Sequence, residues 1–211
     1  MKLKICGMKS PENIIEASEL LPDFMGFIFW QKSARYFDGD IPKLPESIQK
    51  VGVFVNEKIE NIIDKIQKHH LQIVQLHGNE SAAYCSELKK QNIKIIKVFS
   101  IANDFDFEDL KPFEAVSDYF LFDTKGKLPG GNGTRFNWQI LKDYNSEKPF
   151  FLSGGISLDN IETIIDLSKT LPVYGIDVNS MFETAPGVKD IVRLEELFNL
   201  IRVQEQEEAE A

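Results

Sequence analysis

Short apolar runs recur along the chain and are separated by longer segments of mixed polarity. The eight runs cover residues 3–6, 24–30, 50–55, 72–76, 94–99, 119–122, 150–152 and 174–178. Each run is only a few residues long and is rich in isoleucine, valine or phenylalanine, which is typical of parallel strands that are buried on both faces. The pattern therefore predicts eight buried strands.

The segments between these runs favour helices. Ser10 is placed to cap a helix over 11–20, and Pro11 stands at its first position, where a missing backbone N–H costs nothing. Isoleucines at helical spacing predict a helix over 59–66. Further helices are expected over 81–90, 158–167, 191–201 and from about Asn137, whereas the segments after the second and fifth strands look short or irregular.

Eight strands that alternate with about eight helical segments predict a parallel sheet with helical crossovers. Eight units within about 202 residues give roughly 25 residues per unit, which is the compact end for a (β/α)8 barrel. An open doubly wound sheet is the alternative, but it usually has five or six strands. We therefore predict an α/β protein with a single (β/α)8 barrel over 1–202. Residues 203–211 are acidic and lack apolar periodicity, so we expect a disordered tail or a fraying end of the last helix.

Composition and charge exclude several classes of protein. Of the 211 residues, 43% are hydrophobic and 27% are charged, which is ordinary for a soluble globular protein. No apolar run approaches the roughly 20 residues that span a bilayer, and the first residues lack the apolar stretch of a signal peptide. The formal net charge of −9 argues against a general nucleic-acid binder. We expect neither nucleic acid nor membrane as a partner.

The cysteines and histidines carry further information about location and metals. Cys6 and Cys85 are the two cysteines, which cannot form a disulfide framework and suit a reducing cytoplasm. The three histidines show no metal-ligand spacing, so we expect no metal. Cys85 falls within a predicted helix and is expected to pack in the core.

In a (β/α)8 barrel the active site is built from the loops that follow the strands. Cys6 ends the first run and Asp123 follows the sixth. A thiolate at Cys6 could act as a base or a nucleophile, and a small packed side chain is the alternative. Asp123 adjoins a dry strand, where burial favours a protonated carboxyl that can act as a general acid. A helix cap or a loop ion pair is the alternative for Asp123.

Other candidate residues follow the remaining strands. Gly154 and Gly155 follow the seventh strand, and Asp177, Asn179 and Ser180 end or follow the eighth. Loops at these two positions often bind a phosphate through backbone amides, although a tight turn also explains the glycine pair. Arg35 follows the second strand and either binds a carboxylate or lies solvated at the surface. Gln75 and His77 share one strand face and either line the pocket or make structural contacts.

Taken together, these segments resemble the phosphoribosylanthranilate isomerase family over residues 2–202. The resemblance rests on LKICGMKSPENI, GFIFWQKSARYF, VGVFVN, VQLHG, FDT followed by PGGNGTRFNW, FFLSGGI and GIDVNSMFETAPGVKD. It implies a (β/α)8 barrel that catalyses the Amadori rearrangement of N-(5-phosphoribosyl)anthranilate to 1-(2-carboxyphenylamino)-1-deoxyribulose 5-phosphate in tryptophan biosynthesis. It also implies a small-molecule substrate and no cofactor. We expect a monomer, with a dimer as the alternative.

The resemblance implies roles for several residues. Cys6 matches the family's general base, Asp123 its general acid and Arg35 the arginine that faces the anthranilate carboxylate. Gly154-Gly155 and Asn179-Ser180 match its phosphate loops, and Gln75, His77 and Asp177 are expected to bind substrate. A thiol is only a few per cent ionised at neutral pH, so a positive neighbour must lower the pKa of Cys6. Lys4, two residues earlier on the same strand face, is the candidate.

The sequence also departs from the family pattern and leaves other functions open. Ala34, Asn132, Asn137 and the VNSMFE segment replace residues that are commoner in the family, but none of them removes the acid, the base or the phosphate loops. Another sugar-phosphate isomerase or lyase on the same barrel is one alternative. A covalent-thiol enzyme that uses Cys6 is another, and a non-catalytic binder of a phosphate ligand is the third.

Overall fold

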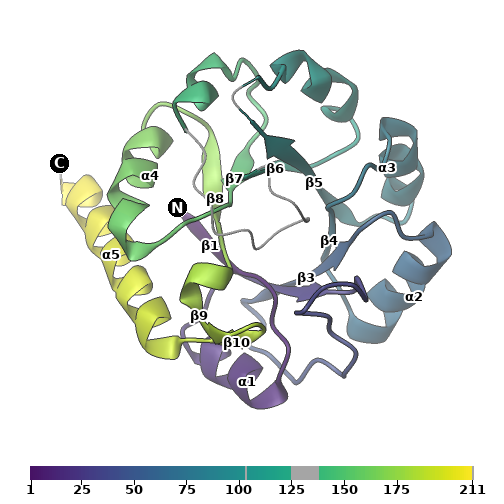
Figure 1. Cartoon of the computed structure of the whole chain (residues 1–211), viewed down its shortest axis with the longest axis horizontal. Coiled ribbons are helices and arrows are strands. Elements are labelled where there is room, and N and C mark those ends of the chain that lie inside the picture. The colour runs from purple at the N-terminus through teal and green to yellow at the C-terminus, as the bar shows by residue number, and fades with distance from the viewer. Residues whose placement is uncertain (103, 125–137, 211) are drawn as a thin grey trace.

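The computed structural model describes residues 1–102, 104–124 and 138–210 (Figure 1). Eight parallel strands form a closed barrel in chain order, and the last strand pairs with the first. The predicted fold class is therefore confirmed, and the open doubly wound sheet is wrong. The strands are β1 (Lys2–Ile5), β2 (Phe24–Ile28), β3 (Gln49–Phe54), β4 (Ile73–Leu76), β5 (Lys94–Ile101), β6 (Tyr119–Thr124), β7 (Phe150–Leu152) and β8 (Val173–Val178).

Helices surround the barrel and cover the outer face of the strands (Figure 1). The α-helices are α1 (Pro11–Glu19), α2 (Ile59–His69), α3 (Ala82–Lys89), α4 (Ile161–Ser168) and α5 (Ile191–Glu210), and the 3-10 helices are η1 (Phe107–Phe113), η2 (Trp138–Asp143), η3 (Leu158–Asn160) and η4 (Ser180–Phe182). The Ser10 hydroxyl caps α1 by accepting a hydrogen bond from the Asn13 N–H, and Ser81 caps α3 in the same way. Helix α5 runs through the expected acidic tail to Glu210.

The segment after β2 is irregular, as expected, whereas one further element was not expected. Residues 29–48, which follow β2, form turns and no helix. Pro42 and Pro45 explain this, because proline removes a backbone donor and disfavours helix in the residue before it. A small antiparallel hairpin of β9 (Glu183–Ala185) and β10 (Val188–Lys189) follows β8 and was not predicted. The expected helix start at Asn137 and the glycine-rich segment that contains Asn132 lie outside the described residues.

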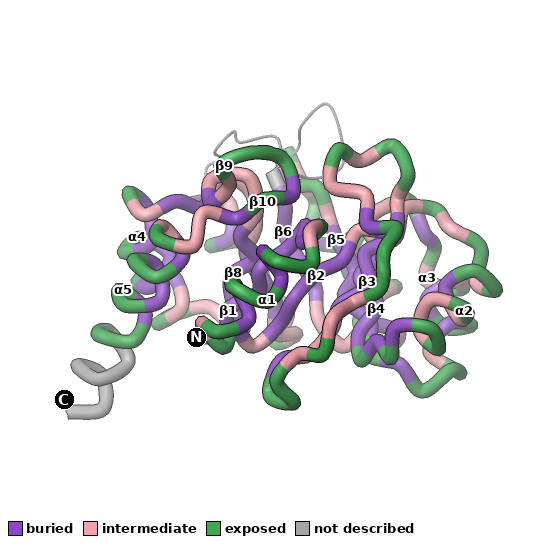
Figure 2. Tube along the Cα trace, turned by 90° about the horizontal axis from the view of Figure 1, so that it is seen from below, coloured by how far each residue is buried: buried purple, intermediate pink, exposed green. Residues whose placement is uncertain are grey.

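The lower part of the barrel interior is a dry layer of side chains. Strand residues that point inward pack together there: Phe24, Val51, Ile73, Ile96, Val98, Leu121 and Phe151. The rings of Phe24 and Phe151 meet edge to face with centroids 5.4 Å apart. Figure 2 shows the strands as the buried centre of the molecule, with exposed segments at its periphery. The interior is therefore a packed core, and polar groups above it lie on a dry floor.

Candidate active site

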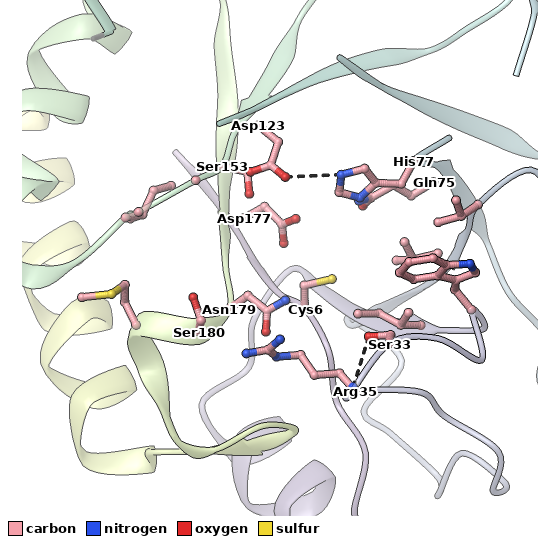
Figure 3. Close-up of a pocket in the computed structure, with 18 residues that line it drawn as sticks. Cys6, Ser33, Arg35, Gln75, His77, Asp123, Ser153, Asp177, Asn179 and Ser180 are labelled. Carbon is pink, nitrogen blue, oxygen red and sulfur yellow. Dashed lines mark hydrogen bonds and ion pairs between the residues drawn. The ribbon is translucent and has the colours of Figure 1, made fainter. Parts of the chain in front are cut away.

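A cavity opens at the carboxyl end of the strands (Figure 3). It is lined by every residue that the sequence singled out as catalytic or substrate-binding, namely Cys6, Arg35, Gln75, His77, Asp123, Gly154, Gly155, Asp177, Asn179 and Ser180. These residues come from the first, second, fourth, sixth, seventh and eighth strands or the loops that follow them. Barrel closure therefore brings side chains from distant parts of the sequence into one cavity.

Cys6 lies directly above a buried ion pair. The Lys4 ammonium donates a hydrogen bond to Asp177 Oδ1 over 2.8 Å, and Lys4 itself is fully buried. Because Lys4 and Cys6 are two residues apart, both side chains point into the barrel. A Cβ placed on Gly26 would lie 2.9 Å from Cys6 Sγ and 3.0 Å from Lys4 Nζ. Only glycine on the neighbouring strand leaves room for these two side chains.

The pKa of Cys6 differs from the expected direction. Burial and the negative charge of Asp177 raise the pKa of the thiol, and Lys4 opposes them without reversing the shift. Lys4 therefore acts on the thiol as expected, but the expected net lowering is wrong for the ligand-free protein. Burial lowers the pKa of Lys4, yet the interactions with Asp177 and Cys6 outweigh burial and leave this pKa above its ordinary value. The resting site thus holds a charged lysine beside a protonated thiol.

Asp123 and His77 meet on the other side of the cavity. Asp123 lies on β6 and its carboxylate Oδ2 is 3.3 Å from His77 Nε2 (Figure 3). Both side chains are largely buried, with 5% of Asp123 and 11% of His77 exposed. The contact places an imidazole beside a carboxyl group that faces the cavity. Asp123 lies within β6 and is therefore not a helix cap, and its ion-pair contact with His77 is made inside the cavity.

The loop that carries His77 is held by a second buried ion pair. Glu80 accepts hydrogen bonds from the backbone N–H groups of Asn56 and Gly78. The Lys97 ammonium lies 3.1 Å from the Glu80 carboxylate and also donates to the Gly78 carbonyl over 2.8 Å. The sequence analysis did not single out Glu80 or Lys97. A lysine within the apolar run 94–99 was the available signal, because a charge in a buried strand needs a partner.

Gln75 faces the cavity from β4 and is almost completely buried. Its side-chain carbonyl Oε1 is buried and has no hydrogen-bond partner among the described residues. A buried polar atom without a partner costs free energy unless something else supplies the hydrogen bond. Gln75 is therefore better suited to contact a ligand than to hold the scaffold.

The loops after β7 and β8 supply backbone groups to the cavity. Gly154 and Gly155 both have left-handed backbones, with φ of +84° and +69°. Glycine lets the backbone of this turn come close to a ligand, so that its N–H groups can bind an anion. Asn160 holds the turn by donating to the Gly155 carbonyl over 2.8 Å. Asn179 and Ser180 reach the same cavity from the loop after β8.

Arg35 lies at the rim of the cavity and is held by a charged network. Its Nε and Nη2 donate to the carboxylate of Glu183 over 2.9 Å and 2.5 Å. Lys189 lies 2.7 Å from the same carboxylate and donates to Asn179 Oδ1 over 2.8 Å. Arg35 is therefore not a solvated surface residue. The sequence analysis quoted the segment that holds Glu183 and Lys189 but gave neither a role.

Two further observations on the described residues concern metal-ligand groups and membrane-spanning helices. Within residues 1–102, 104–124 and 138–210, no group of three or more His, Cys, Asp or Glu residues is placed to hold a metal ion. No helix in these ranges is long and apolar enough to cross a membrane. Cys85 is buried in α3 away from the cavity, as expected, and burial raises its pKa to about 11.

Comparisons with known proteins agree with this geometry. Residues 3–200 match the family model described as N-(5'phosphoribosyl)anthranilate (PRA) isomerase. The chain is 44% identical to the N-(5'-phosphoribosyl)anthranilate isomerase of Phocaeicola vulgatus, with 96% of this chain and 98% of the relative covered. It is 43% identical to that of Parabacteroides distasonis, with 95% and 93% covered.

Solved structures show the same similarity. The phosphoribosyl anthranilate isomerase of Thermotoga maritima superposes with a TM-score of 0.78 at 32% identity, covering 92% of this chain and 95% of the other. A solved isomerase in complex with reduced 1-(o-carboxyphenylamino)-1-deoxyribulose 5-phosphate superposes with a TM-score of 0.79 at 30% identity, covering 94% and 96%. Sequence and structure thus point to the same group of isomerases.

Proposed function

The chain belongs to the N-(5'-phosphoribosyl)anthranilate isomerase family, and from this premise we propose that Cys6 and Asp123 are the base and the acid of its reaction. The reaction is the Amadori rearrangement of N-(5-phosphoribosyl)anthranilate in tryptophan biosynthesis. The observation that carries the proposal is that one cavity holds a buried thiol just beyond β1 and a buried carboxyl group on β6. The rearrangement needs two groups of opposite protonation state on one sugar.

Asp123 starts the reaction in this proposal. In its protonated form it gives a proton to the furanose ring oxygen, and the C1–O bond breaks to leave a protonated Schiff base between C1 and the anthranilate nitrogen. The contact with His77 supports this role, because it places a second polar side chain beside the carboxyl group in the cavity. Proton transfer requires a donor within hydrogen-bond reach of its acceptor, so the orientation of the carboxyl group matters as much as its acidity.

Cys6 completes the rearrangement. Its thiolate takes the proton from C2, and the electron pair of that C–H bond moves to the C1–C2 bond to give an enolamine. Tautomerisation, with a proton added at C1, then yields the ketose. The raised pKa of the thiol means that little thiolate exists in the resting site. Lys4 contributes a buried positive charge that stabilises the thiolate when it forms.

We assign the two anionic ends of the substrate to different groups of residues in the cavity. We assign the ribose phosphate to Gly154, Gly155, Asn179 and Ser180, where the glycine backbone supports anion binding. We assign the anthranilate carboxylate to Arg35, whose guanidinium lines the rim. Gln75, His77 and Asp177 face the sugar between these ends in this arrangement. Binding energy from both ends is remote from the reacting carbons and can position them.

Replacing Cys6 with Ser should abolish turnover and leave the fold intact, because a hydroxyl of similar size has too high a pKa to act as the base. Loss of a general base costs about 10²–10⁴-fold in rate. Turnover is followed by the fluorescence of phosphoribosylanthranilate under single-turnover conditions, and folding by thermal unfolding. Cys85→Ala, which changes the thiol outside the cavity, is the control and should remain active. Activity of Cys6→Ser within about tenfold of wild type would remove the base assignment.

Asp123→Asn should also stop the reaction, at the ring-opening step. The amide has nearly the shape of the carboxyl group but is too weak an acid, and the expected loss is again about 10²–10⁴-fold. Substrate affinity should change little, because the phosphate loops are untouched. Asp109→Asn, at an exposed position in η1, is the matched control. If Asp123→Asn keeps substantial turnover, or loses binding instead, Asp123 only positions the substrate.

Arg35→Met keeps much of the side-chain stem and removes the guanidinium. A charge-assisted bidentate contact in a closed site contributes on the order of 2 kcal/mol, so binding of the reduced carboxyphenylamino ketose phosphate should weaken by about tenfold or more. Affinity for inorganic phosphate should be nearly unchanged, because the backbone of Gly154 and Gly155, which we assign to the phosphate, does not depend on the guanidinium. The control is Arg202→Met, at an exposed position on α5. Equal weakening toward both ligands would contradict the carboxylate assignment.

We further propose that one chain suffices for activity, because all of the assigned residues come from the same barrel. A monomer of 24.1 kDa should then give a specific activity that does not change on dilution, with its mass checked by light scattering at the same concentrations. Activity that falls as a dimer dissociates would contradict this proposal. Two buried free cysteines suit a reducing cytoplasm, which cell fractionation would test.

A further inference from the structure

The hairpin after β8 places a carboxylate and an ammonium behind Arg35. Glu183 in β9 is paired with Lys189 in β10, and their side chains form an ion pair over 2.7 Å. The Gly187 N–H also donates to the Glu183 carboxylate over 3.1 Å. Asn13 of α1 fixes the Lys189 backbone through two hydrogen bonds, of 2.6 Å and 3.0 Å. The pair is thus anchored by backbone and side-chain contacts before it meets Arg35.

Glu183 uses only one edge of the Arg35 guanidinium. It accepts from Nε and Nη2, which form the side of the fork. A guanidinium has five N–H donors, so the end formed by Nη1 and Nη2 can still bind a second carboxylate through two hydrogen bonds. The geometry therefore allows Arg35 to hold Glu183 and a ligand carboxylate at the same time.

Glu183, which pairs with Arg35, and Lys189, which pairs with Glu183, are both more deeply buried than Arg35. Arg35 lines the cavity with 15% of its side chain exposed, whereas only 4% of Glu183 and none of Lys189 are exposed. Two positive charges and one negative charge leave this group with a net charge of +1. Lys189 thus offsets the repulsion that Glu183 would exert on an incoming anion. The group can orient Arg35 without neutralising it.

From these contacts we infer that Glu183, balanced by Lys189, is a positioning residue that aims Arg35 at the carboxylate on the aromatic ring of the substrate. The inference rests on the role proposed above for Arg35. Without Glu183, the long arginine side chain would have to be ordered at the moment of binding, and that ordering costs affinity. Lys189 also holds Asn179, so the hairpin links the carboxylate end of the cavity to the phosphate loop.

The test compares two ligands that differ only in the carboxylate. One is reduced 1-(o-carboxyphenylamino)-1-deoxyribulose 5-phosphate, and the other is the same molecule with an unsubstituted phenyl ring. Glu183→Gln should weaken binding of the carboxylate ligand by about fivefold, within the range of coupling between residues in contact, and should change binding of the phenyl ligand less than about twofold. Calorimetry gives both affinities. Glu19→Gln, at an exposed position on α1, is the control and should change neither.

A double variant shows whether Glu183 acts through Arg35. If it does, Arg35→Met combined with Glu183→Gln should bind the carboxylate ligand no more weakly than Arg35→Met alone. Tighter binding of that ligand to Glu183→Gln, equal weakening toward both ligands, or additive losses in the double variant would overturn the inference. If Arg35→Met itself does not weaken binding of the carboxylate ligand, the proposed role of Arg35 fails first.

Glu183→Gln leaves the buried Lys189 ammonium without a charged partner, which is costly and can prevent folding. Glu183→Asp is therefore the second variant, because it retains a carboxylate. The shorter side chain keeps a negative charge near Lys189, and we expect it to lose the bidentate contact with Arg35, which needs both carboxylate oxygens at full reach. Its thermal unfolding should stay close to that of the wild type. It should nevertheless show the same selective weakening toward the carboxylate ligand, and wild-type affinity for that ligand would overturn the inference.

Discussion

The buried ion pair of Lys4 and Asp177 is the interaction around which the site is organised. It joins the first and last strands across the seam where the barrel closes, over 2.8 Å. The layer beneath is composed of phenylalanine and aliphatic side chains, so neither charge has an alternative partner below it. Removing one member of such a pair costs about 3–5 kcal/mol, because the other charge remains buried and unpaired. The pair thus links barrel closure to the electrostatics of the thiol above it.

Similar ion pairs hold other parts of the rim. Lys97 and Glu80 fix the loop that carries His77, and Glu183 with Lys189 holds Arg35. Lys97 joins β5 to the loop after β4, and Glu183 joins the hairpin after β8 to the loop after β2, so the lower barrel is held by apolar packing and its mouth by buried charges. Charged groups of this kind are costly to bury and are weak evidence for added stability. At the mouth of the barrel they hold the His77 loop and the Arg35 side chain in place around the cavity.

Much of this arrangement could be predicted from the sequence, because strand periodicity and barrel topology are local and regular. The short apolar runs located all eight strands, and the residues just beyond them, such as Cys6 and Asp123, met in one cavity as expected. Pairing between distant charges could not be predicted in this way. Glu183 reaches Arg35 across 148 positions of sequence, and no spacing rule connects them.

The direction of the pKa shift at Cys6 also could not be predicted from the sequence. Sequence reasoning placed Lys4 beside the thiol correctly, but it did not weigh burial and the charge of Asp177 against that lysine. Burial depends on how tightly the surrounding strands close, and Gly26 shows how little space the barrel leaves at this point. The balance of opposing effects is therefore a property of the folded site and cannot be read from neighbouring residues alone.

The protonation state of Cys6 in the ligand-free enzyme tests this account most directly. The rate at which iodoacetamide alkylates Cys6 is measured against pH, and peptide mass spectrometry separates Cys6 from Cys85. The account predicts a thiol that reacts as though its pKa lies above the ordinary value of about 8.5. An apparent pKa near or below neutrality would contradict it. Such a value would mean that Lys4 outweighs burial and Asp177, and that the resting site already holds the thiolate.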